Sequence, residues 1–231
     1  FDECAIPTDY AYSKLAMQRT HAWAHRCQEA KTRSDQALFG IVQGGIFSDL
    51  RAESAQTLAA LDFPGYAIGG LSVGESKADM LRTISEVNQI LPKNKPRYLM
   101  GVGTPQDLIE GVLRGVDIFD CVLPTRLARH NSAMTLTGRM NLMNAAYARD
   151  ERPINPDCQC YTCQHFSRAY LRHLVNAKEM LAATLLSIHN LYTLVNLTQR
   201  MRQAILAGEM QRFAQETLAA IAASQTVEEE E

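Results

Sequence analysis

The sequence lacks several features that would assign it to a familiar class of protein. It has no uninterrupted apolar run long enough to cross a membrane, and no basic, apolar leader followed by small residues. These absences predict a cytoplasmic protein with no membrane partner. The formal net charge of −2 gives no overall bias toward nucleic acid. Gly101 and Gly103 lack the third glycine of a dinucleotide-binding fingerprint, so this pair excludes that motif here.

The composition is that of an ordinary globular protein, but the charges are unevenly distributed along the chain. Of the 231 residues, 46% are hydrophobic and 21% are charged, which is enough to bury a sizeable core. The segment from Arg126 to Lys178 is rich in arginine, whereas the chain ends in the acidic run 228–231. This distribution predicts a basic surface around Asp120. The alternative is a mixed surface in which these arginines are solvated individually.

Short apolar segments alternate with amphipathic helical patterns over the first 120 residues. Helices are expected at 10–31, 48–61, 76–91 and 104–115, with Ser76 and Thr104 as N-caps. The segments between them end in polar or glycine-rich sequence, namely at Asp2, Gln43, Gly69-Gly70, Met100-Gly101 and Asp120. The carboxyl ends of parallel strands meet at one edge of a sheet. Five such ends favour an α/β fold of the (β/α)₈ TIM-barrel type over an open sheet with one switch point.

The domain organisation follows from the same patterns. The chain begins at Phe1 and not at methionine, and Phe1 to Cys4 has the pattern of a strand's end. We therefore expect a piece of a longer polypeptide, with residues 1–130 forming the C-terminal portion of the barrel. Residues 131–205 are expected to hold a hairpin with its turn at Thr137-Gly138, a zinc-binding subdomain and a returning helix. Residues 206–231 are expected to be a C-terminal helix and an acidic tail.

Asp120 is the strongest candidate for a catalytic side chain. Val116, Ile118 and Phe119 give the preceding segment the pattern of a buried parallel strand. A carboxylate at the end of such a strand lies where α/β folds bind ligands and place catalytic groups. On position alone, a helix cap or a solvated turn residue is an equally good interpretation of an aspartate.

The spacing Cys158, Cys160 and Cys163 predicts a metal site. Three cysteines so close cannot all pair with one another, and thiolates at this spacing suit tetrahedral Zn²⁺. His189 is the favoured fourth ligand, while His165 and His173 compete with it on spacing. Four protein ligands leave no open position, so the expected zinc is structural, with one ion per chain. The alternative is a group of free buried thiols.

Six motifs now carry a resemblance to a known family. In chain order they are FDEC, FGIVQGG, YAIGGLSVGE, YLMGVG, FDCVLPTR and CxCxxC with its distant histidine. Together they resemble the tRNA-guanine transglycosylase, or queuine tRNA-ribosyltransferase, family of bacterial type without its N-terminal part. The resemblance implies a (β/α)₈ barrel with a zinc-bearing insertion near the C-terminus. It also implies an enzyme that exchanges guanine at the wobble position of certain tRNAs for a 7-deazaguanine base.

The resemblance implies a role for each matched residue. Asp120 is similar to the nucleophile that attacks C1′ of the ribose. The residues implied in binding the base are Asp2, Gln43, Gly70, Leu71, Glu75, Tyr98 and Met100. Val73 matches bacterial members of the family and favours the small base preQ1 over queuine. Thr125, Arg126 and Arg129 are implied in binding tRNA.

The resemblance leaves the assembly and two other functions open. Its implied partners are tRNA, guanine and preQ1, and members of the family are commonly dimers, so a homodimer is expected. One alternative is a non-catalytic tRNA-binding accessory subunit of the same family, against which Asp2 and Asp120 argue. The other is an unrelated barrel glycosidase that acts on sugars, which the basic segment and the zinc motif disfavour.

Overall fold

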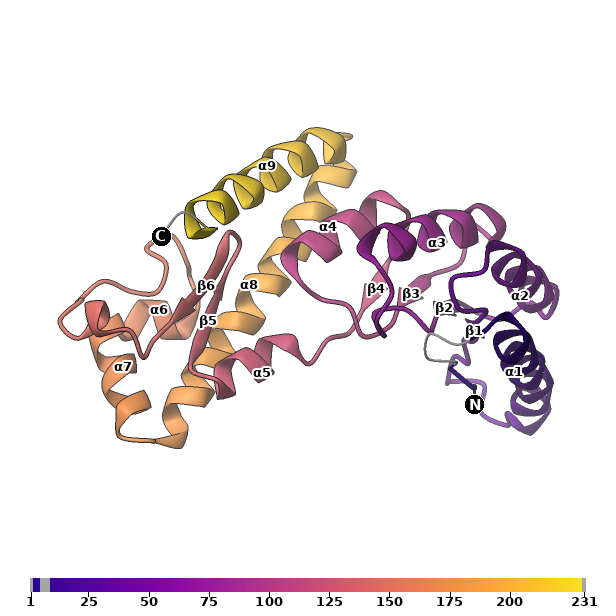
Figure 1. Cartoon of the computed structure of the whole chain (residues 1–231), viewed down its shortest axis with the longest axis horizontal. Helices are drawn as coiled ribbons and strands as arrows, with labels where there is room; N and C mark the ends of the chain where they lie inside the picture. The colour runs from indigo at the N-terminus through magenta and orange to yellow at the C-terminus, as the bar shows by residue number, and fades with distance from the viewer. Residues whose placement is uncertain (1, 5–8, 230–231) are drawn as a thin grey trace. The chain divides into compact units, whose positions relative to one another are not determined.

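The computed structural model describes residues 2–4 and 9–229 of the chain (Figure 1). Contacts between residues divide it into two compact units. The first unit comprises Phe1–Val102 and Glu110–Asp120, and the second comprises Gly103–Ile109 and Cys121–Glu231. Phe1, which the sequence predicts in a strand's end, lies outside the described residues.

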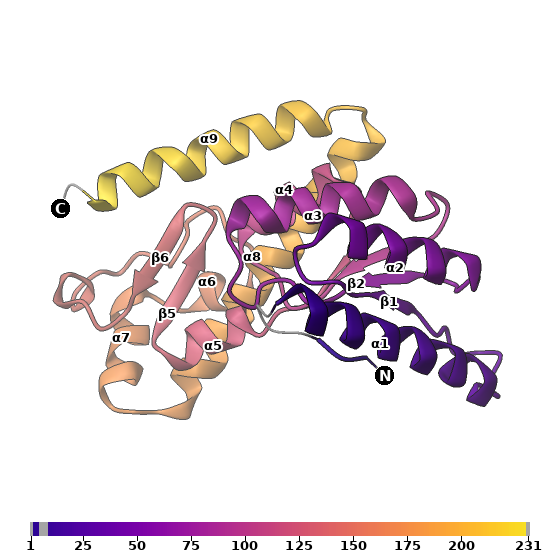
Figure 2. The same cartoon turned by 45° about the vertical axis from the view of Figure 1, so that its right-hand side comes forward.

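The first unit is built on a four-stranded parallel sheet in the order β1-β2-β3-β4 (Figure 1), and Figure 2 shows β1 and β2 beside helices α1 and α2. Its strands are β1 (Gly40–Val42), β2 (Tyr66–Ile68), β3 (Arg97–Leu99) and β4 (Ile118–Phe119). The helices are α1 (Tyr10–Ala30), α2 (Ser48–Ala60), α3 (Lys77–Ile90) and α4 (Pro105–Leu113), of which the last spans both units. Neighbouring strands therefore follow one another in the chain with one helix between them. The predicted alternation of strand and helix is confirmed, and the fold is α/β.

The ends of the helices follow the predicted signals. Ser76 Oγ accepts a hydrogen bond from the Asp79 N–H at the start of α3, 3.1 Å away. Thr104 Oγ1 accepts one from the Asp107 N–H at the start of α4, also at 3.1 Å. Gly115, beyond the end of α4, has φ +86°, a left-handed conformation that side chains disfavour. These three residues were predicted correctly because caps depend only on nearby backbone.

The core of the first unit lies between one face of the sheet and the helices. Val42, Ile68 and Leu99 lie in register on neighbouring strands and are fully buried in the main hydrophobic cluster. Burying an aliphatic side chain of this size contributes about 1.5–3 kcal/mol. Residues of the other face, such as Tyr98 and Ile118, are only partly covered. Helix α1 packs beside α2, and α2 packs beside α3.

Asp2 to Cys4 do not form the predicted end of a strand. The Glu3 N–H donates instead to Thr20 Oγ1 on α1, at 2.9 Å. The Glu3 carboxylate accepts hydrogen bonds from Tyr12 Oη at 2.6 Å and from Arg19. The segment is therefore held by side chains of α1, which a strand pattern in the sequence could not reveal.

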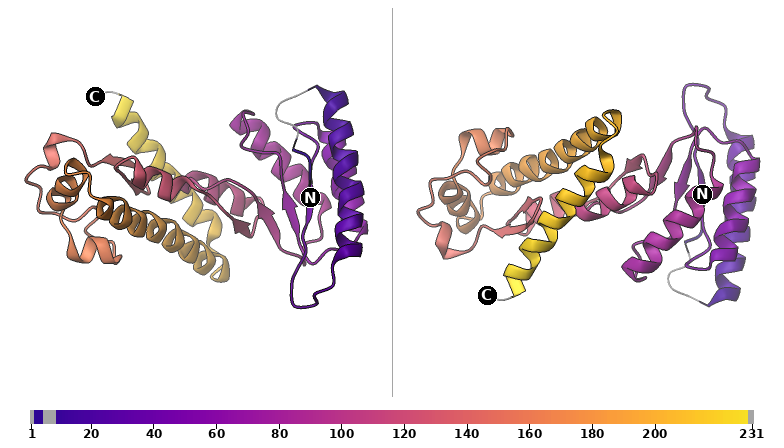
Figure 3. Two further views of the ribbon diagram at one scale, coloured as in Figure 1. Left: turned by 90° about the horizontal axis from the view of Figure 1, so that it is seen from below. Right: turned by 90° about the horizontal axis from the view of Figure 1, so that it is seen from above.

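The second unit is organised around the long helix α8 (Figure 3). Helices α5, α6, α7 and α9 and strand β5 all pack on α8. The elements are α5 (Leu123–Arg129), β5 (Ser132–Thr135), β6 (Gly138–Asn141), η1 (Ala145–Tyr147), α6 (Tyr161–His165), α7 (Arg168–Asn176), α8 (Met180–Leu206) and α9 (Met210–Glu229). Its core includes Ala133, Leu171, Leu185 and Leu186 together with three cysteines.

The predicted hairpin forms, with its turn one residue earlier than expected. Strands β5 and β6 are antiparallel, and Thr135 pairs with Gly138. The connecting residues are therefore Leu136 and Thr137, not Thr137 and Gly138. The turn was misplaced because a glycine was expected within it, whereas Gly138 has no positive φ and belongs to the strand.

Helix α8 is long and apolar enough on average to cross a membrane, although polar residues interrupt its apolar sequence. Its 27 residues include an 18-residue window with a mean hydropathy of 1.3. Length and composition do not separate a membrane span from the core helix of a soluble protein. The buried side of α8 carries His189 and Asn190, and the Asn190 amide binds backbone groups of Pro124, Ser132 and Met134. These contacts identify α8 as the packing helix of the second unit.

Candidate active site and metal centre

Asp120 follows β4 directly and is held by two hydrogen bonds from the first unit. Tyr98 Oη donates to Asp120 Oδ1 at 2.6 Å, and the Gly101 N–H donates to the same oxygen at 2.9 Å. Tyr98 lies on β3, beside β4 in the sheet, and Gly101 lies in the loop after β3. The carboxylate itself is exposed. One oxygen is thus fixed while the group stays accessible to a ligand.

The two donors keep Asp120 ionised. The hydrogen bond from Tyr98, followed by that from the Gly101 N–H, holds the pKa of Asp120 below its ordinary value. The same contact raises the pKa of Tyr98 to about 12, so the phenol stays protonated and remains a donor. At neutral pH this pair therefore presents a carboxylate anion, which can act as a nucleophile or stabilise a developing positive charge.

Asp2 and Gln43 meet beside the carboxyl end of β1. Gln43 follows β1 and is almost fully buried, and its Nε2 donates to Asp2 Oδ2 at 2.7 Å. The Gln43 N–H donates to Ser54 Oγ on α2 at 3.2 Å. Ser54 Oγ also lies 3.0 Å from His21 Nε2 on α1. Backbone and side chain of Gln43 are thus both held, which leaves its amide in a defined orientation.

The loop after β2 contains the other predicted base-binding residues. Gly70 has φ +65°, and a Cβ added there would lie 2.5 Å from Gln43 Oε1, so only glycine fits. Leu71 is buried, whereas the Glu75 carboxylate turns back onto its own loop and accepts the N–H groups of Ser72 and Val73. Met100, after β3, remains 37% exposed.

The three cysteines and His189 form a compact buried cluster in the second unit. Their ligand atoms all lie within 4.8 Å of one another. His189 Nδ1 lies 3.7, 3.5 and 3.3 Å from the sulfurs of Cys158, Cys160 and Cys163. Tetrahedral Zn²⁺ with ordinary bond lengths places nitrogen and sulfur ligands about 3.5 Å apart. The donor set and its spacing therefore fit a metal ion of this kind.

The surroundings of the cluster also fit a metal. His189 Nε2 lies 3.0 Å from the Met134 carbonyl oxygen on β5, so Nε2 carries the proton and Nδ1 faces the thiols unprotonated. Burial raises the pKa of Cys158 and of Cys163. A bound cation offsets that effect and keeps the thiols ionised. His165, one of the competing ligands, is exposed, and its Nδ1 lies 2.9 Å from the Tyr161 carbonyl oxygen.

Comparison with known proteins identifies the family of this chain. The family model described as queuine tRNA-ribosyltransferase matches residues 1–223. The chain belongs to the queuine tRNA-ribosyltransferase family. It is 57% identical to the queuine tRNA-ribosyltransferase of Herpetosiphon aurantiacus, 52% to that of Halothermothrix orenii and 54% to that of Bacillus velezensis. Each of these alignments covers 94% of this chain and 56% to 59% of the relative, so the chain spans less than two thirds of their length.

The predicted tRNA-binding residues of this family member lie on α5, in the second unit. Arg126 and Arg129 are exposed and one turn apart, so they share a face of the helix. No ion pair among the described residues includes either of them. Thr125 Oγ1 donates to the Val122 carbonyl oxygen at 3.1 Å.

Several arginines of the arginine-rich segment are bound within the second unit, while the predicted basic surface around Asp120 stays a prediction. Arg152 and Arg168 both bind the Asp150 carboxylate, at 2.8 and 3.0 Å, and their charges are therefore partly neutralised. Arg172 donates to the Asn144 carbonyl oxygen. A count of charges along the chain could not reveal these ion pairs within the segment.

Two residues near the candidate site were missed by the sequence analysis. Glu3 fixes the segment that contains Asp2 by binding Tyr12 and Arg19, as described above. Arg51, predicted only as part of an amphipathic helix, is fully buried and points toward the loops after β1 and β2. An arginine on the packing side of a predicted helix is the one signal that could have drawn attention to Arg51.

Proposed function

We propose that the protein is a tRNA-guanine transglycosylase that exchanges guanine at the wobble position of tRNA for preQ1. Membership of the family supports the reaction class. The observation that carries the proposal is the Asp120 carboxylate, which is exposed, kept ionised and held through one oxygen by Tyr98 and Gly101. A carboxylate in this state suits attack on a ribose carbon with oxocarbenium character.

The exchange takes place in two displacements. Asp120 Oδ2 forms a bond to C1′ while the bond from C1′ to N9 of guanine breaks, and the electron pair leaves with the base, which takes up a proton. The product is a covalent ester between the aspartate and the ribose of the tRNA. The incoming base, having lost a proton from N9, then attacks C1′ and releases the carboxylate. Two displacements at one carbon retain its configuration.

The residues after β1, β2 and β3 read the base in this proposal. The Asp2 carboxylate accepts hydrogen bonds from N1–H and the 2-amino group of guanine. The Gln43 amide and the Gly70 N–H donate to O6, which flanks N1 on the side away from the 2-amino group. Met100 packs on the face of the base, which must leave the anticodon stack to reach it. Leu71 and Glu75 receive the aminomethyl group of preQ1, and the bulk of Val73 next to them disfavours the larger queuine.

The second unit supplies the RNA contacts. Arg126 and Arg129 bind anticodon phosphates together with Thr125, and they position the tRNA without reading its sequence. Zn²⁺, one per chain, is held by Cys158, Cys160, Cys163 and His189 and stabilises the fold of this unit when bound.

The proposed architecture places these parts in a larger fold. Residues 1–130 form the C-terminal portion of a (β/α)₈ barrel, 131–205 the hairpin, zinc subdomain and returning helix, and 206–231 the last helix and tail. The four successive parallel strands support this assignment. The enzyme acts in the cytoplasm without a membrane partner, and a homodimer is its proposed assembly.

Incorporation of labelled guanine into tRNA by the full-length, zinc-loaded protein tests the proposal. Asp120→Asn removes the nucleophile and should abolish incorporation while tRNA binding persists. A denaturing gel should show labelled tRNA attached to the unmodified protein and none attached to the variant. If the unmodified protein binds tRNA without incorporating guanine, it is instead a non-catalytic tRNA-binding accessory subunit, and the proposal fails.

A further inference from the structure

Arg51 joins the two loops that carry the proposed base-reading groups. It lies on α2 and is fully buried. Its Nη1 donates to the carbonyl oxygen of Val42, the last residue of β1, at 3.0 Å, and its Nε to that of Gly45 in the following loop at 2.7 Å. After β2, Nη1 donates to the Gly69 carbonyl oxygen at 2.8 Å and Nη2 to that of Gly70 at 3.3 Å. One guanidinium therefore fixes the separation of the two loops.

Arg51 makes these bonds as a cation. Burial lowers its pKa to about 10, so it remains protonated at neutral pH. All four hydrogen bonds run to uncharged carbonyl oxygens, and bonds from a charged donor are stronger than those between neutral groups. A planar guanidinium has five N–H donors in a fixed fork, and lysine cannot reproduce that geometry.

The orientation of these carbonyls determines where the neighbouring N–H groups point. In a trans peptide the C=O and N–H bonds point in opposite directions. Because Arg51 holds the Gly69 carbonyl, the Gly70 N–H faces away from Arg51, and because it holds the Gly70 carbonyl, the Leu71 N–H does the same. Among the described residues, neither N–H takes part in a hydrogen bond. Both donors are therefore available to a ligand.

Gln43 is fixed against the same peptides. Arg51 binds the carbonyls on both sides of Gln43, at Val42 and Gly45. A Cβ on Gly69 would lie 2.5 Å from Gln43 Nε2, so the amide lies directly against this loop. The Gln43 amide, whose Nε2 also donates to Asp2, and the two N–H groups are thus held against one another.

We infer that Arg51 is a positioning residue for base recognition, which aims the Gly70 and Leu71 N–H groups and the Gln43 amide at the oxygen-bearing edge of the purine. The inference rests on the proposed function and extends it to a residue that touches neither base nor ribose. Loss of Arg51 should weaken recognition of O6 more than that of the 2-amino group, because Glu3 holds the segment that contains Asp2 against α1.

The test compares the unmodified full-length protein with Arg51→Lys. Guanine incorporation gives kcat and KM, and inhibition by 2-aminopurine, which lacks O6, gives a Ki for a base without that acceptor. In Arg51→Lys we expect KM for guanine to rise about tenfold and the preference for guanine over 2-aminopurine to fall about tenfold. A merely structural loss would weaken both bases equally and leave that ratio unchanged, which would overturn the inference.

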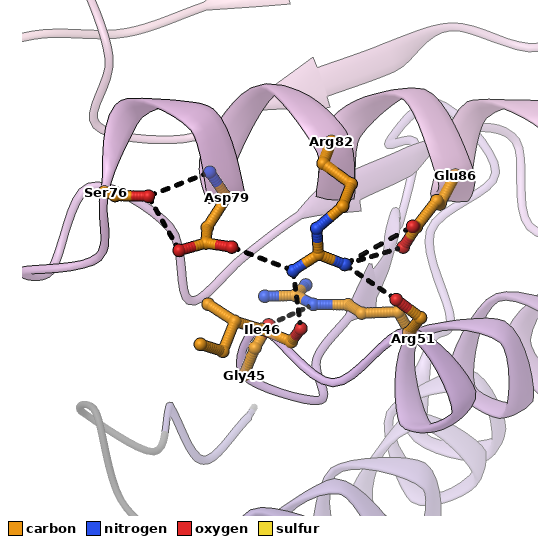
Figure 4. Close-up of polar contacts among 8 residues, drawn as sticks. Gly45, Ile46, Arg51, Ser76, Asp79, Arg82 and Glu86 are labelled. Carbon is orange, nitrogen blue, oxygen red and sulfur yellow. Dashed lines mark hydrogen bonds and ion pairs between the residues drawn. The ribbon is translucent and has the colours of Figure 1, made fainter.

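Arg82→Lys is the matched control. Arg82, on α3, also reaches the loop after β1, where it binds the Ile46 carbonyl and Ser48 Oγ and pairs with Asp79 and Glu86 (Figure 4). It contacts none of the four carbonyls that Arg51 holds. Its substitution should leave both KM for guanine and the base preference within about twofold of the unmodified values.

Amide hydrogen exchange of the unmodified protein tests the orientation without any variant. The Gly70 and Leu71 amides should exchange quickly in the free protein and slow at least about tenfold when guanine is bound. Exchange that guanine leaves unchanged would overturn the inference while the proposed function stands. If the unmodified protein incorporates no guanine, the proposed function and the inference both fail.

Discussion

At the scale of single residues, the environment of Asp120 is the main determinant of the proposed chemistry. An aspartate is common in loops, and what distinguishes this one is a phenol and a backbone N–H that share one of its oxygens. Tyr98 contributes the larger part of the fall in the pKa of Asp120. The contact is possible because β3 and β4 are neighbours in register.

Tyr98→Phe should therefore raise the pKa of Asp120 and lower activity. A depressed carboxylate pKa keeps the nucleophile ionised down to lower pH, so removing its main cause should move the acidic limb of the kcat/KM profile to higher pH. At neutral pH we expect a loss of about tenfold, the usual effect of losing a hydrogen bond to a charged group. The measurement is the pH dependence of guanine incorporation.

Tyr10→Phe is the control for this prediction. Tyr10 Oη, on α1, likewise donates to a carboxylate, that of Asp49 on α2, and neither residue is among the proposed catalytic or binding groups. Its removal should leave the pH profile in place. An acidic limb that stays unchanged in Tyr98→Phe would show that Asp120 does not govern the reaction.

At the scale of elements, the sequence predicted those features that depend on near neighbours in the chain. The sequence predicted the helix ends at Ser76, Thr104 and Gly115 and the spacing of the three cysteines, since each is a local pattern. The roles of Arg51 and Asn190 could not be predicted, because their partners are backbone carbonyls and amides that only tertiary folding brings close. His189, by contrast, was favoured as the fourth ligand from the sequence, and the packing of α6 on α8 brings it to the cysteines.

His189→Ala should remove the metal and destabilise the second unit. A change outside the ligand shell of a metal commonly costs 10–100-fold in affinity, so loss of a ligand should cost more than about a hundredfold. We expect one Zn²⁺ per chain in the unmodified protein by elemental analysis, far less in the variant, and a Tm lower by about 5 °C or more.

His165→Ala provides the comparison for the metal site. His165 is close in sequence to the cysteines, but it is exposed and its Nδ1 lies against the Tyr161 carbonyl oxygen of its own helix. The variant should keep its metal and its Tm. Equal metal loss in both variants would contradict the assignment of His189 as the fourth ligand.

At the scale of the whole molecule, the formal net charge of −2 does not show that the arginines fall into two groups with different surroundings. Some are used internally, such as Arg51 against carbonyls and Arg168 against Asp150. Others, Arg126 and Arg129, are exposed and without an ion pair among the described residues. The net charge of a chain is therefore a poor guide to RNA binding, and its exposed arginines without ion pairs are a better one.

The double variant Arg126→Ala/Arg129→Ala should bind tRNA more weakly and with a weaker dependence on salt. Each phosphate contact contributes about 0.7–0.9 to the slope of log K against log salt concentration, so the slope should fall by about 1.5. The measurement is tRNA binding over a range of salt concentrations. Arg33→Ala, which removes an arginine paired with Asp35, should leave the slope unchanged.

The two oxygens of Asp120 have unequal surroundings, and this inequality bears on the second half of the proposed exchange. If Oδ2 forms the bond to the ribose, Oδ1 becomes the carbonyl oxygen of the ester and keeps both of its donors. Those donors withdraw electron density from the ester and make the carboxylate a better leaving group. Tyr98 and Gly101 would then ease departure of the enzyme from the ribose.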